Sequence, residues 1–499
     1  MAIVDPGGHP ARYWDPGARQ IFFVNPQPPY ARDWWGWGPR IGVEWGPSEA
    51  TTLHAGFAIT TILPNLFQDN QVTGSVPYVL DPRFTTLPGA LVPFTNGIVA
   101  FNPPPAYTPQ GQLIFTGAST SVPPNTELDL DRLEKDLAAL SPGHQVAASL
   151  IFGQAQNFLN GYIETYTAGL DHSFGDIALS LSYVGTAGVK LVNEIYPNAY
   201  AGASPPFAPF TRFDATGHVL GGIGFEALVA NPGHSTFNAG TAAVSKSSAR
   251  LGLGFQLNYT FSKSLDDSSS VLGGSVGANS GAMLQPPPQD PRRPGLEKAP
   301  STFDITQVFV ASFILNLPFD RVPALHRFGP VASGWQLLNI STITSGSPFT
   351  VLSGIQQTGL GAGQADRPDQ VGKPALSTGQ TVREDYFGSG AANGSFFLIP
   401  INVPGGSGPN QGKLGTLGRN TFRGPGFHDF DVALLKETNF GHRSGSEAVR
   451  VQFRAEFFNG FNLVNFGLPN NILQGSGFGL ISRTAGTSRQ VQFSLKLVY

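Results

Sequence analysis

The stretch Val491–Tyr499, VQFSLKLVY, places an apolar side chain at every second position and mostly polar side chains between them. Successive side chains of a strand point to opposite faces, so the pattern predicts a strand with one apolar and one polar face. A soluble domain would leave such a terminal strand as an apolar edge that is open to aggregation. We therefore expect this strand to close a barrel in a membrane.

The same alternation recurs along the chain. In VRVQFRAEF (449–457), the apolar side chains oppose a face formed by Arg450, Gln452, Arg454 and Glu456. LGLGFQLNYTF (251–261) and DIALSLSYV (176–184) repeat the pattern with small or polar residues on the second face. A β-sandwich produces the same alternation, so no single strand decides between a sandwich and a membrane barrel.

Strand lengths and connections favour the barrel. The predicted hairpins pair 163–172 with 176–186, 236–246 with 249–262, and 427–440 with 447–458. Soluble strands average nearer 5–6 residues, whereas a tilted membrane strand needs about 9–11. The predicted connections between pairs are long and rich in Gly, Pro, Ser and Asn: 187–235, 263–300, 346–426 and 459–486. Short turns alternating with long loops are typical of outer-membrane barrels, in which the long loops are extracellular.

Composition agrees with an all-β chain and argues against several functions. The 62 Gly and 42 Pro among 499 residues predict many turns, and a hydrophobic fraction of 40% argues against wholesale disorder. A net charge of −3 offers no basic surface for nucleic acid. Because there is no cysteine, disulfides, thiol nucleophiles and cysteine-based metal sites are excluded. No apolar run approaches the roughly 20 residues of a membrane-spanning helix.

Two segments depart from the strand pattern. The N-terminal segment 1–36 predicts irregular structure, and its start, MAIVDPGGHPARYWDPG, lacks the basic and apolar regions of an export signal. We expect either a fragment of a longer precursor or an internally placed gene start. TELDLDRLEKDLAAL (126–140) has leucines near helical spacing and predicts a short amphipathic helix within a loop.

Several motifs together carry a family resemblance. The most specific are GRNTFRGPGFHDFDVALLKETNF (418–440) and VQFRAEFFNGFNLVNFGLPN (451–470), supported by YIETYTAGLDHSFGDIALSLSYVGTAGVKL (162–191) and WGPRIGVEWGPSEATTLHAGFAI (37–59). The chain resembles the C-terminal part of Oar-like TonB-dependent receptors, a type abundant in Acidobacteria. We count roughly a dozen strands, against about 22 in a complete transporter. The expected fold is therefore an all-β, antiparallel transmembrane β-barrel with long extracellular loops, in which 37–499 forms roughly the C-terminal half of a 22-stranded barrel.

The resemblance also implies location and partners. A bacterial outer-membrane location makes lipid a partner, and the extracellular ligand is unknown. The barrel-assembly machinery reads a terminal aromatic residue that follows alternating apolar ones, a pattern that matches Phe493, Leu495, Leu497 and Tyr499. A TonB complex would act only through an N-terminal region, with its signal peptide and plug, that is not recognisable before residue 37.

The polar face of 449–457 holds the candidate lumen residues. A charge that faces lipid at the midplane costs about 2–4 kcal/mol, so we expect Arg450, Gln452, Arg454 and Glu456 to face an aqueous interior. They would pair with a plug domain or with one another across neighbouring strands. The clustered tryptophans, with Tyr and Phe at strand ends, predict aromatic girdles at the two membrane interfaces.

No catalytic, cofactor-binding or metal-binding residues are predicted. The nine histidines show no ligand spacing, and Asp429 and Asp431 beside His428 are interpreted as ordinary solvated charges of a lumen face. In SLDDSSS (264–270), Asp266 and Asp267 would suit a Ca²⁺ loop, but solvated surface acids are the favoured interpretation.

Three functional hypotheses follow. The preferred one is an outer-membrane TonB-dependent receptor barrel that takes up or binds a bulky ligand without catalysis. The alternatives are a non-transporting surface adhesin or structural barrel, and a secreted soluble β-sandwich that binds glycans.

Overall fold

The computed structural model describes thirteen parts of the chain and the backbone of seven further short strands. The parts are 36–63, 158–195, 226–247, 252–269, 288–290, 294–354, 366–374, 376, 382–388, 396–399, 414–440, 449–475 and 477–498. The short strands are β1 (Arg12–Asp15), β2 (Gln20–Phe23), β5 (Arg83–Thr86), β6 (His144–Ala147), β7 (Ile151–Gln154), β10 (Thr211–Phe213) and β11 (Val219–Gly222). The predicted helix at 126–140 and the side chain of Tyr499 lie outside these residues.

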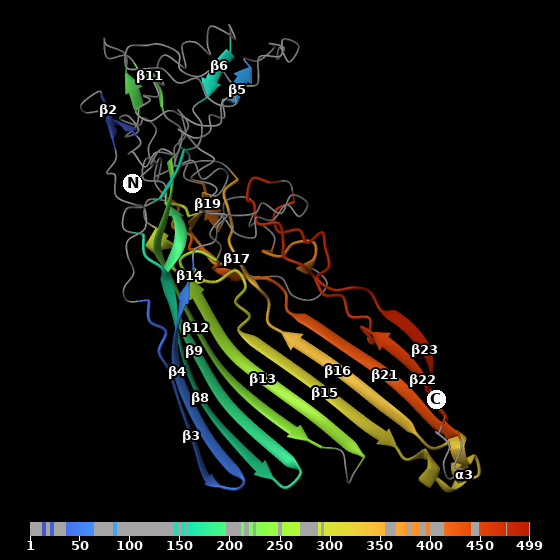
Figure 1. Ribbon diagram of the computed structural model, residues 1–499. Helices are drawn as coiled ribbons and strands as arrows, with labels where there is room; N and C mark the ends of the chain where they lie inside the picture. Colours follow the sequence, from blue (N-terminus) through green and yellow to red (C-terminus); the bar gives the residue numbers. More distant parts are fainter. Residues whose placement is uncertain are drawn as a thin grey trace, which may run out of the picture.

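One large antiparallel sheet dominates the molecule (Figure 1). In its main path each strand pairs with the next long strand of the chain. The strands are β3 (Arg40–Ser48), β4 (Thr51–Ile62), β8 (Gly161–Phe174), β9 (Ile177–Ile195), β12 (Glu226–Lys246), β13 (Leu253–Asp266), β15 (Gln307–Leu317), β16 (Trp335–Thr344), β21 (Phe427–Phe440), β22 (Val449–Phe458) and β23 (Gln490–Val498). The strand β14 (Ala299–Pro300) adds to β13, and β7 pairs in parallel with β12.

The three predicted hairpins are confirmed as β8–β9, β12–β13 and β21–β22. Their alternating side chains favour extended pairing, and the β8–β9 turn contains a residue suited to tight reversal. Between β8 and β9, Gly175 has φ +63°, a conformation that glycine adopts without steric penalty.

The predicted loop 187–235 is too long. β9 continues to Ile195 and β12 already begins at Glu226, so much of this segment is paired strand. The register shifts on either side of Gly233, and Lys190 has φ +55°, so the regular period-2 pattern is interrupted. Bulges of this kind hide a strand from an alternation test because they reverse the phase of the side chains.

The sheet has two open edges among the described residues. β3 pairs only with β4, and β23 pairs only with β22, and both are exposed along their whole length. The expectation that Val491–Tyr499 closes a barrel is therefore not met in the structure, because neither edge strand has a partner on its outer side.

The remaining elements are short. The pairs are β1–β2, β5–β6, β10–β11, β17 (Pro348–Phe349) with β20 (Phe422–Arg423), and β18 (Asp369–Gln370) with β19 (Phe397–Leu398). Within the part of the chain that the structure describes, the helices are η2 (Pro294–Glu297), η3 (Phe319–Arg321), α3 (Pro323–His326) and η4 (Gly329–Val331). Among the described residues, no helix is both long and apolar enough to cross a membrane. The segment 1–36 contains β1 and β2, and its boundary as a separate region stays a prediction.

The two ends of the sheet differ in their connections. At the short-turn end, tight or moderate links join β3–β4, β8–β9, β12–β13, β15–β16 and β21–β22. At the long-loop end, the connections are 63–160, 196–225, 267–306, 345–426 and 459–489. Figure 1 shows β17 and β19 near the long-loop end and α3 at the opposite end. This asymmetry is the one expected of an outer-membrane barrel.

Candidate functional site: a two-faced sheet and an ordered loop cap

Most strands of the sheet carry apolar side chains on one shared face, called here the apolar face, and β16 departs from this by placing Asn339 and Ser341 on it. Residues paired directly across an antiparallel ladder share a face, so the register assigns every side chain. The pairs Ile41–Phe57, Phe255–Phe313 and Phe457–Val491 all lie on this apolar face. Along β13 it carries Leu253, Phe255, Leu257, Tyr259 and Phe261, which span about the length of a membrane strand.

No second layer of the described residues covers the apolar face. On the edge strands, Ile41 is 68% exposed, Phe493 66% and Leu495 74%. On the inner strands, Phe261 is still 55% exposed although neighbouring strands flank it on both sides. A β-sandwich would bury these side chains against a facing sheet. A single sheet with an uncovered apolar face is instead what a hydrocarbon surrounding requires.

Charged side chains on the apolar face stand near the strand ends. Lys246 and Lys436 lie toward the short-turn end, and Lys263 lies toward the long-loop end. The charges flank an apolar band, and a charge within such a band costs about 2–4 kcal/mol at the bilayer midplane.

The opposite face carries the predicted lumen residues. Arg450 Nε lies 3.5 Å from Glu437 Oε1 on the neighbouring strand, and Gln452 Nε2 donates to Glu437 Oε2 over 3.5 Å. Arg454 pairs with Glu456 at 3.3 Å on its own strand. The side chains are partly exposed, so each ion pair contributes at most about 1 kcal/mol. The structure places the four residues on one face, and their role in lining an aqueous interior stays a prediction.

The predicted terminal residues lie on the apolar face. Phe493, Leu495 and Leu497 pair with Ala455, Phe453 and Val451 of β22. The rings of Phe453 and Phe493 stack with centroids 6.3 Å apart. Recognition of these residues by the barrel-assembly machinery stays a prediction.

An apolar patch on the polar face was not predicted. Ile314, Leu338 and Ile340 lie on that face, where Ile314 is 45% and Ile340 is 58% exposed. They line a cavity of about 290 Å³ together with Arg454 and Glu456. The nearly continuous apolar sequence of β15 could have predicted this patch, because strands that are apolar on both faces are usually covered on both faces.

The grouping of His428, Asp429 and Asp431 is not a metal centre in the structure. His428 lies on the apolar side of the register and both aspartates lie on the other. Asp431 Oδ1 accepts a hydrogen bond from the Asn459 backbone N–H at 2.9 Å. Within the described residues, no three His, Cys, Asp or Glu side chains are grouped so that they could hold a metal ion.

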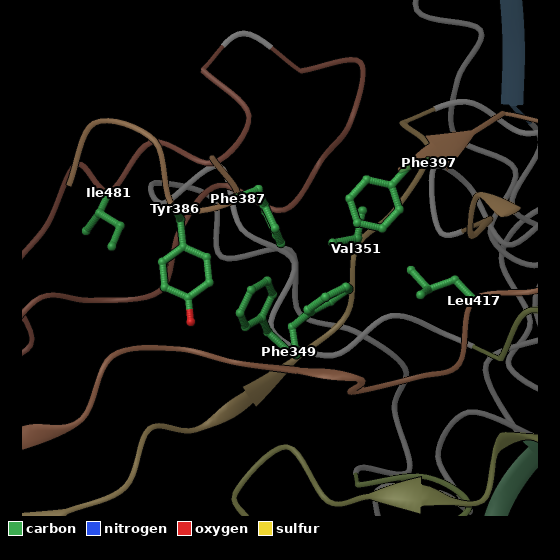
Figure 2. Close-up of a cluster of buried hydrophobic side chains, with 8 residues drawn as sticks. Phe349, Val351, Tyr386, Phe387, Phe397, Leu417 and Ile481 are labelled. Atoms are coloured by element: carbon green, nitrogen blue, oxygen red, sulfur yellow. The ribbon is translucent and has the colours of Figure 1, made fainter. Parts of the chain in front are cut away.

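The described residues of three long connections pack together into one assembly. We call the described residues of the connections 267–306, 345–426 and 459–489 the loop cap. Its core is a cluster of buried side chains, several of them shown in Figure 2: Phe349, Val351, Tyr386, Phe387, Phe397, Leu417, Phe422 and Ile481. Phe387 stacks on Phe478 with ring centroids 4.7 Å apart, so a residue of the last connection packs on one from the previous connection.

Three arginines join the connections of the loop cap through ion pairs. Arg419 donates to Asp266 Oδ1 at 2.5 Å, and both side chains are almost fully buried. Arg367 forms a two-pronged pair with Glu297, at 2.5 and 2.9 Å. The third, Arg423, pairs with the carboxylate of Asp304, which is itself completely buried. The Arg419 pair links the connection 345–426 to β13, and the other two pairs link it to the connection 267–306.

The two acids of the SLDDSSS stretch are not solvated, so that interpretation was wrong. Asp266 is 4% and Asp267 is 5% exposed. Arg419 neutralises Asp266, and Asp267 Oδ2 accepts the His234 backbone N–H at 3.0 Å. The physical reason is tertiary, since Arg419 lies 153 positions along the chain from Asp266.

The GRNTFRG stretch (418–424) is the centre of the loop cap. Between its two arginines, Asn420 adopts φ +52°, its N–H donates to Thr350 Oγ1 at 2.8 Å, and its side chain donates to the Pro300 carbonyl at 2.7 Å. Tyr386 O–H donates to the Arg423 carbonyl. Burial raises the pKa of Tyr386 to about 12. Sequence reasoning noted this motif but did not assign it a structural task.

Comparison with known proteins identifies the class. The sequence model of the outer membrane beta barrel domain family matches residues 3–492, and the chain belongs to this family. It is therefore a protein of the bacterial outer membrane, and an uncovered apolar face is consistent with contact with membrane lipid.

Several solved structures of outer-membrane transporters are distantly similar to the chain. The outer membrane transporter YddB from Escherichia coli is 9% identical, with a TM-score of 0.39, 91% of this chain covered and 39% of that one. The siderophore receptor PirA from Acinetobacter baumannii is 10% identical, with a TM-score of 0.39 and coverages of 92% and 40%. For the FrpB iron transporter from Neisseria meningitidis, the identity is 11%, the TM-score 0.36 and the coverages 92% and 38%. The chain thus spans about two fifths of their length. No protein of curated function matches the sequence.

Proposed function

We propose that the chain is the barrel part of an Oar-like TonB-dependent receptor, which binds a bulky ligand at its long-loop end and takes part in its uptake. No bond is made or broken in this function. The observation that carries the proposal is the loop cap, which is ordered by a buried aromatic core and by buried ion pairs. A rigid, preorganised surface loses less conformational entropy on binding than mobile loops do.

The apolar patch on the polar face supports the same function. Ile314, Leu338 and Ile340 would face water in an open pore, which is unfavourable for side chains of this size. A plug domain, which the resemblance implies, would cover them and would meet Arg454 and Glu456 at the patch border. This arrangement favours a gated receptor over an open channel.

The proposal is tested by uptake in the native cell. Cells with and without the gene receive fluorescently labelled casein peptides or labelled dextrins, with and without a protonophore. We expect uptake of at least one probe pool to require both the gene and the proton gradient, while surface binding requires only the gene. Gene-independent uptake of every probe pool would contradict the receptor function.

The first alternative, a surface adhesin, makes a different prediction in the same assay. Surface binding would depend on the gene, whereas no uptake would respond to the protonophore. An Arg419→Met variant sharpens the comparison because it disturbs the loop cap, and Lys298→Ala is its control because Lys298 is exposed in the same assembly. The second alternative, a secreted soluble sandwich, is set aside by the outer-membrane family and by the single-layer sheet.

A further inference from the structure

The connection between β15 and β16 differs from the other links of the short-turn end. It consists of residues 318–334, contains η3, α3 and η4, and is called here the helical connection. It follows Leu317 and precedes Trp335, which face each other in register on the apolar side of the sheet. Polar contacts with Trp335 and Lys436, two side chains on the apolar side, fix its position relative to the sheet.

These contacts hold the helical connection against the lipid-facing side. Trp335 Nε1 donates to the Val331 carbonyl at 2.8 Å, and the Phe319 ring meets the Trp335 ring edge-on at 6.5 Å. The ammonium of Lys436, paired with Trp335 in register, donates to the Pro330 carbonyl at 2.6 Å and also to the Ser333 carbonyl. The connection therefore lies where the apolar band ends.

The exposed side chains of the helical connection include apolar and basic ones, together with one acid, Asp320. The apolar ones include Val331, which is 68% exposed, Phe328 at 48% and Val322 at 42%. The basic ones are Arg321 and Arg327, and the Arg327 guanidinium lies 4.9 Å above the Phe328 ring. A soluble turn gains nothing from exposing large apolar residues, whereas apolar side chains beside arginines suit the boundary between headgroups and acyl chains.

We propose that the helical connection is a membrane-surface anchor that inserts Phe328 and Val331 among the lipid headgroups at the short-turn end. Arg321 and Arg327 bind the phosphate groups of anionic phospholipids there. Placement beside Trp335 and Lys436 brings the segment to the lipid, and charge complementarity selects anionic headgroups. The anchor depends on the outer-membrane location alone and not on ligand uptake.

A fluorophore at position 328 tests the anchor. The chain has no cysteine, so Phe328→Cys in the full-length protein gives a single site for an environment-sensitive label. The protein is inserted into vesicles of phosphatidylcholine with phosphatidylglycerol, and lipids brominated at known depths act as quenchers. We expect a depth about 5–10 Å inside the headgroup boundary. Leu257→Cys is the reference for hydrocarbon, and Glu49→Cys, in the β3–β4 turn at the same end, is the reference for water.

The charge requirement is tested in the same background. Adding Arg321→Gln and Arg327→Gln should move the label toward water in vesicles with phosphatidylglycerol, with a loss of affinity for the anionic surface of about fivefold per arginine. In pure phosphatidylcholine the two changes should have little effect. Quenching at position 328 no greater than in Glu49→Cys would overturn the anchor, and equal depth with and without the arginines would overturn their role. Circular dichroism of every variant checks that the sheet is intact.

Discussion

Removal of the Arg419 side chain is expected to make local opening of the loop cap more frequent while the sheet stays folded. In Arg419→Met, the carboxylate of Asp266 loses its 2.5 Å partner in a site that is 4% exposed. The Asp266 and Glu297 carbonyls lose donors at 2.6 and 3.0 Å. Removing one partner of a buried ion pair costs about 3–5 kcal/mol. Local opening of the cap should therefore become more frequent by roughly two to three and a half powers of ten.

Hydrogen exchange of the full-length protein in micelles, followed by mass spectrometry, measures this opening directly. Peptides that contain 349–351 and 417–422 should exchange faster, whereas peptides of β21 and β22 should not change. Arg383→Met is the matched control, because Arg383 is an exposed arginine of the same cap and should have an effect within about 0.5 kcal/mol. Adding Asp266→Asn to Arg419→Met should restore much of the protection, since no buried charge then lacks a partner. Equal exchange in the two arginine variants would refute the reasoning.

Three further predictions concern the apolar face, the cap and one close contact. Leu257→Arg should destabilise the vesicle-inserted protein by about 2–4 kcal/mol in urea unfolding, whereas Gln256→Arg on the opposite face should cost far less; equal losses would contradict the face assignment. Tyr386 should titrate near pH 12 in the tyrosinate absorbance and the step should vanish in Tyr386→Phe. Because its pKa is raised above that of the unfolded chain, its contribution is complete below about pH 10 and falls by up to about 1.4 kcal/mol per pH unit from there to about 12; a step near pH 10 would contradict the burial. Gly185→Ala should cost about 1–3 kcal/mol in urea unfolding because its Cβ would meet the Tyr166 ring at 2.0 Å, while Gly240→Ala, with open space, should be near neutral; similar effects would contradict that contact.

The sheet was largely predictable from local pattern. In VRVQFRAEF (449–457), each residue is apolar or polar according to the face on which it lies. The alternation can therefore be recognised from the sequence alone. The predicted limits of β21 agree with the structure, and those of β22 differ by two residues at the start. Where a bulge reverses the phase, as around Gly233, the same test fails and strand is mistaken for loop.

The loop cap was not predictable by the same reasoning. Its ion pairs join residues far apart in the chain, and nothing local to Asp266 indicates Arg419 as its partner. Composition rich in Gly and Pro suggested only turns, although Phe349, Phe387 and Phe397 were available to form a core. The shared face of the candidate residues on β22 follows from alternation. Whether β23 closes a barrel does not follow from alternation, because closure requires a partner strand on its outer side, and alternation does not specify that partner.

A spin-label scan along β13 tests most directly whether one face of the sheet meets hydrocarbon. Single cysteines from Leu253 to Phe261 in the vesicle-inserted protein would be probed with molecular oxygen, which dissolves in lipid, and with a water-soluble nickel chelate. We expect oxygen accessibility to peak at the odd-numbered positions and to be low at Gln256 and Asn258. Low accessibility to both reagents at Leu253, Phe255 and Leu257 would mean that protein covers the odd-numbered face, and it would contradict the membrane assignment of this sheet.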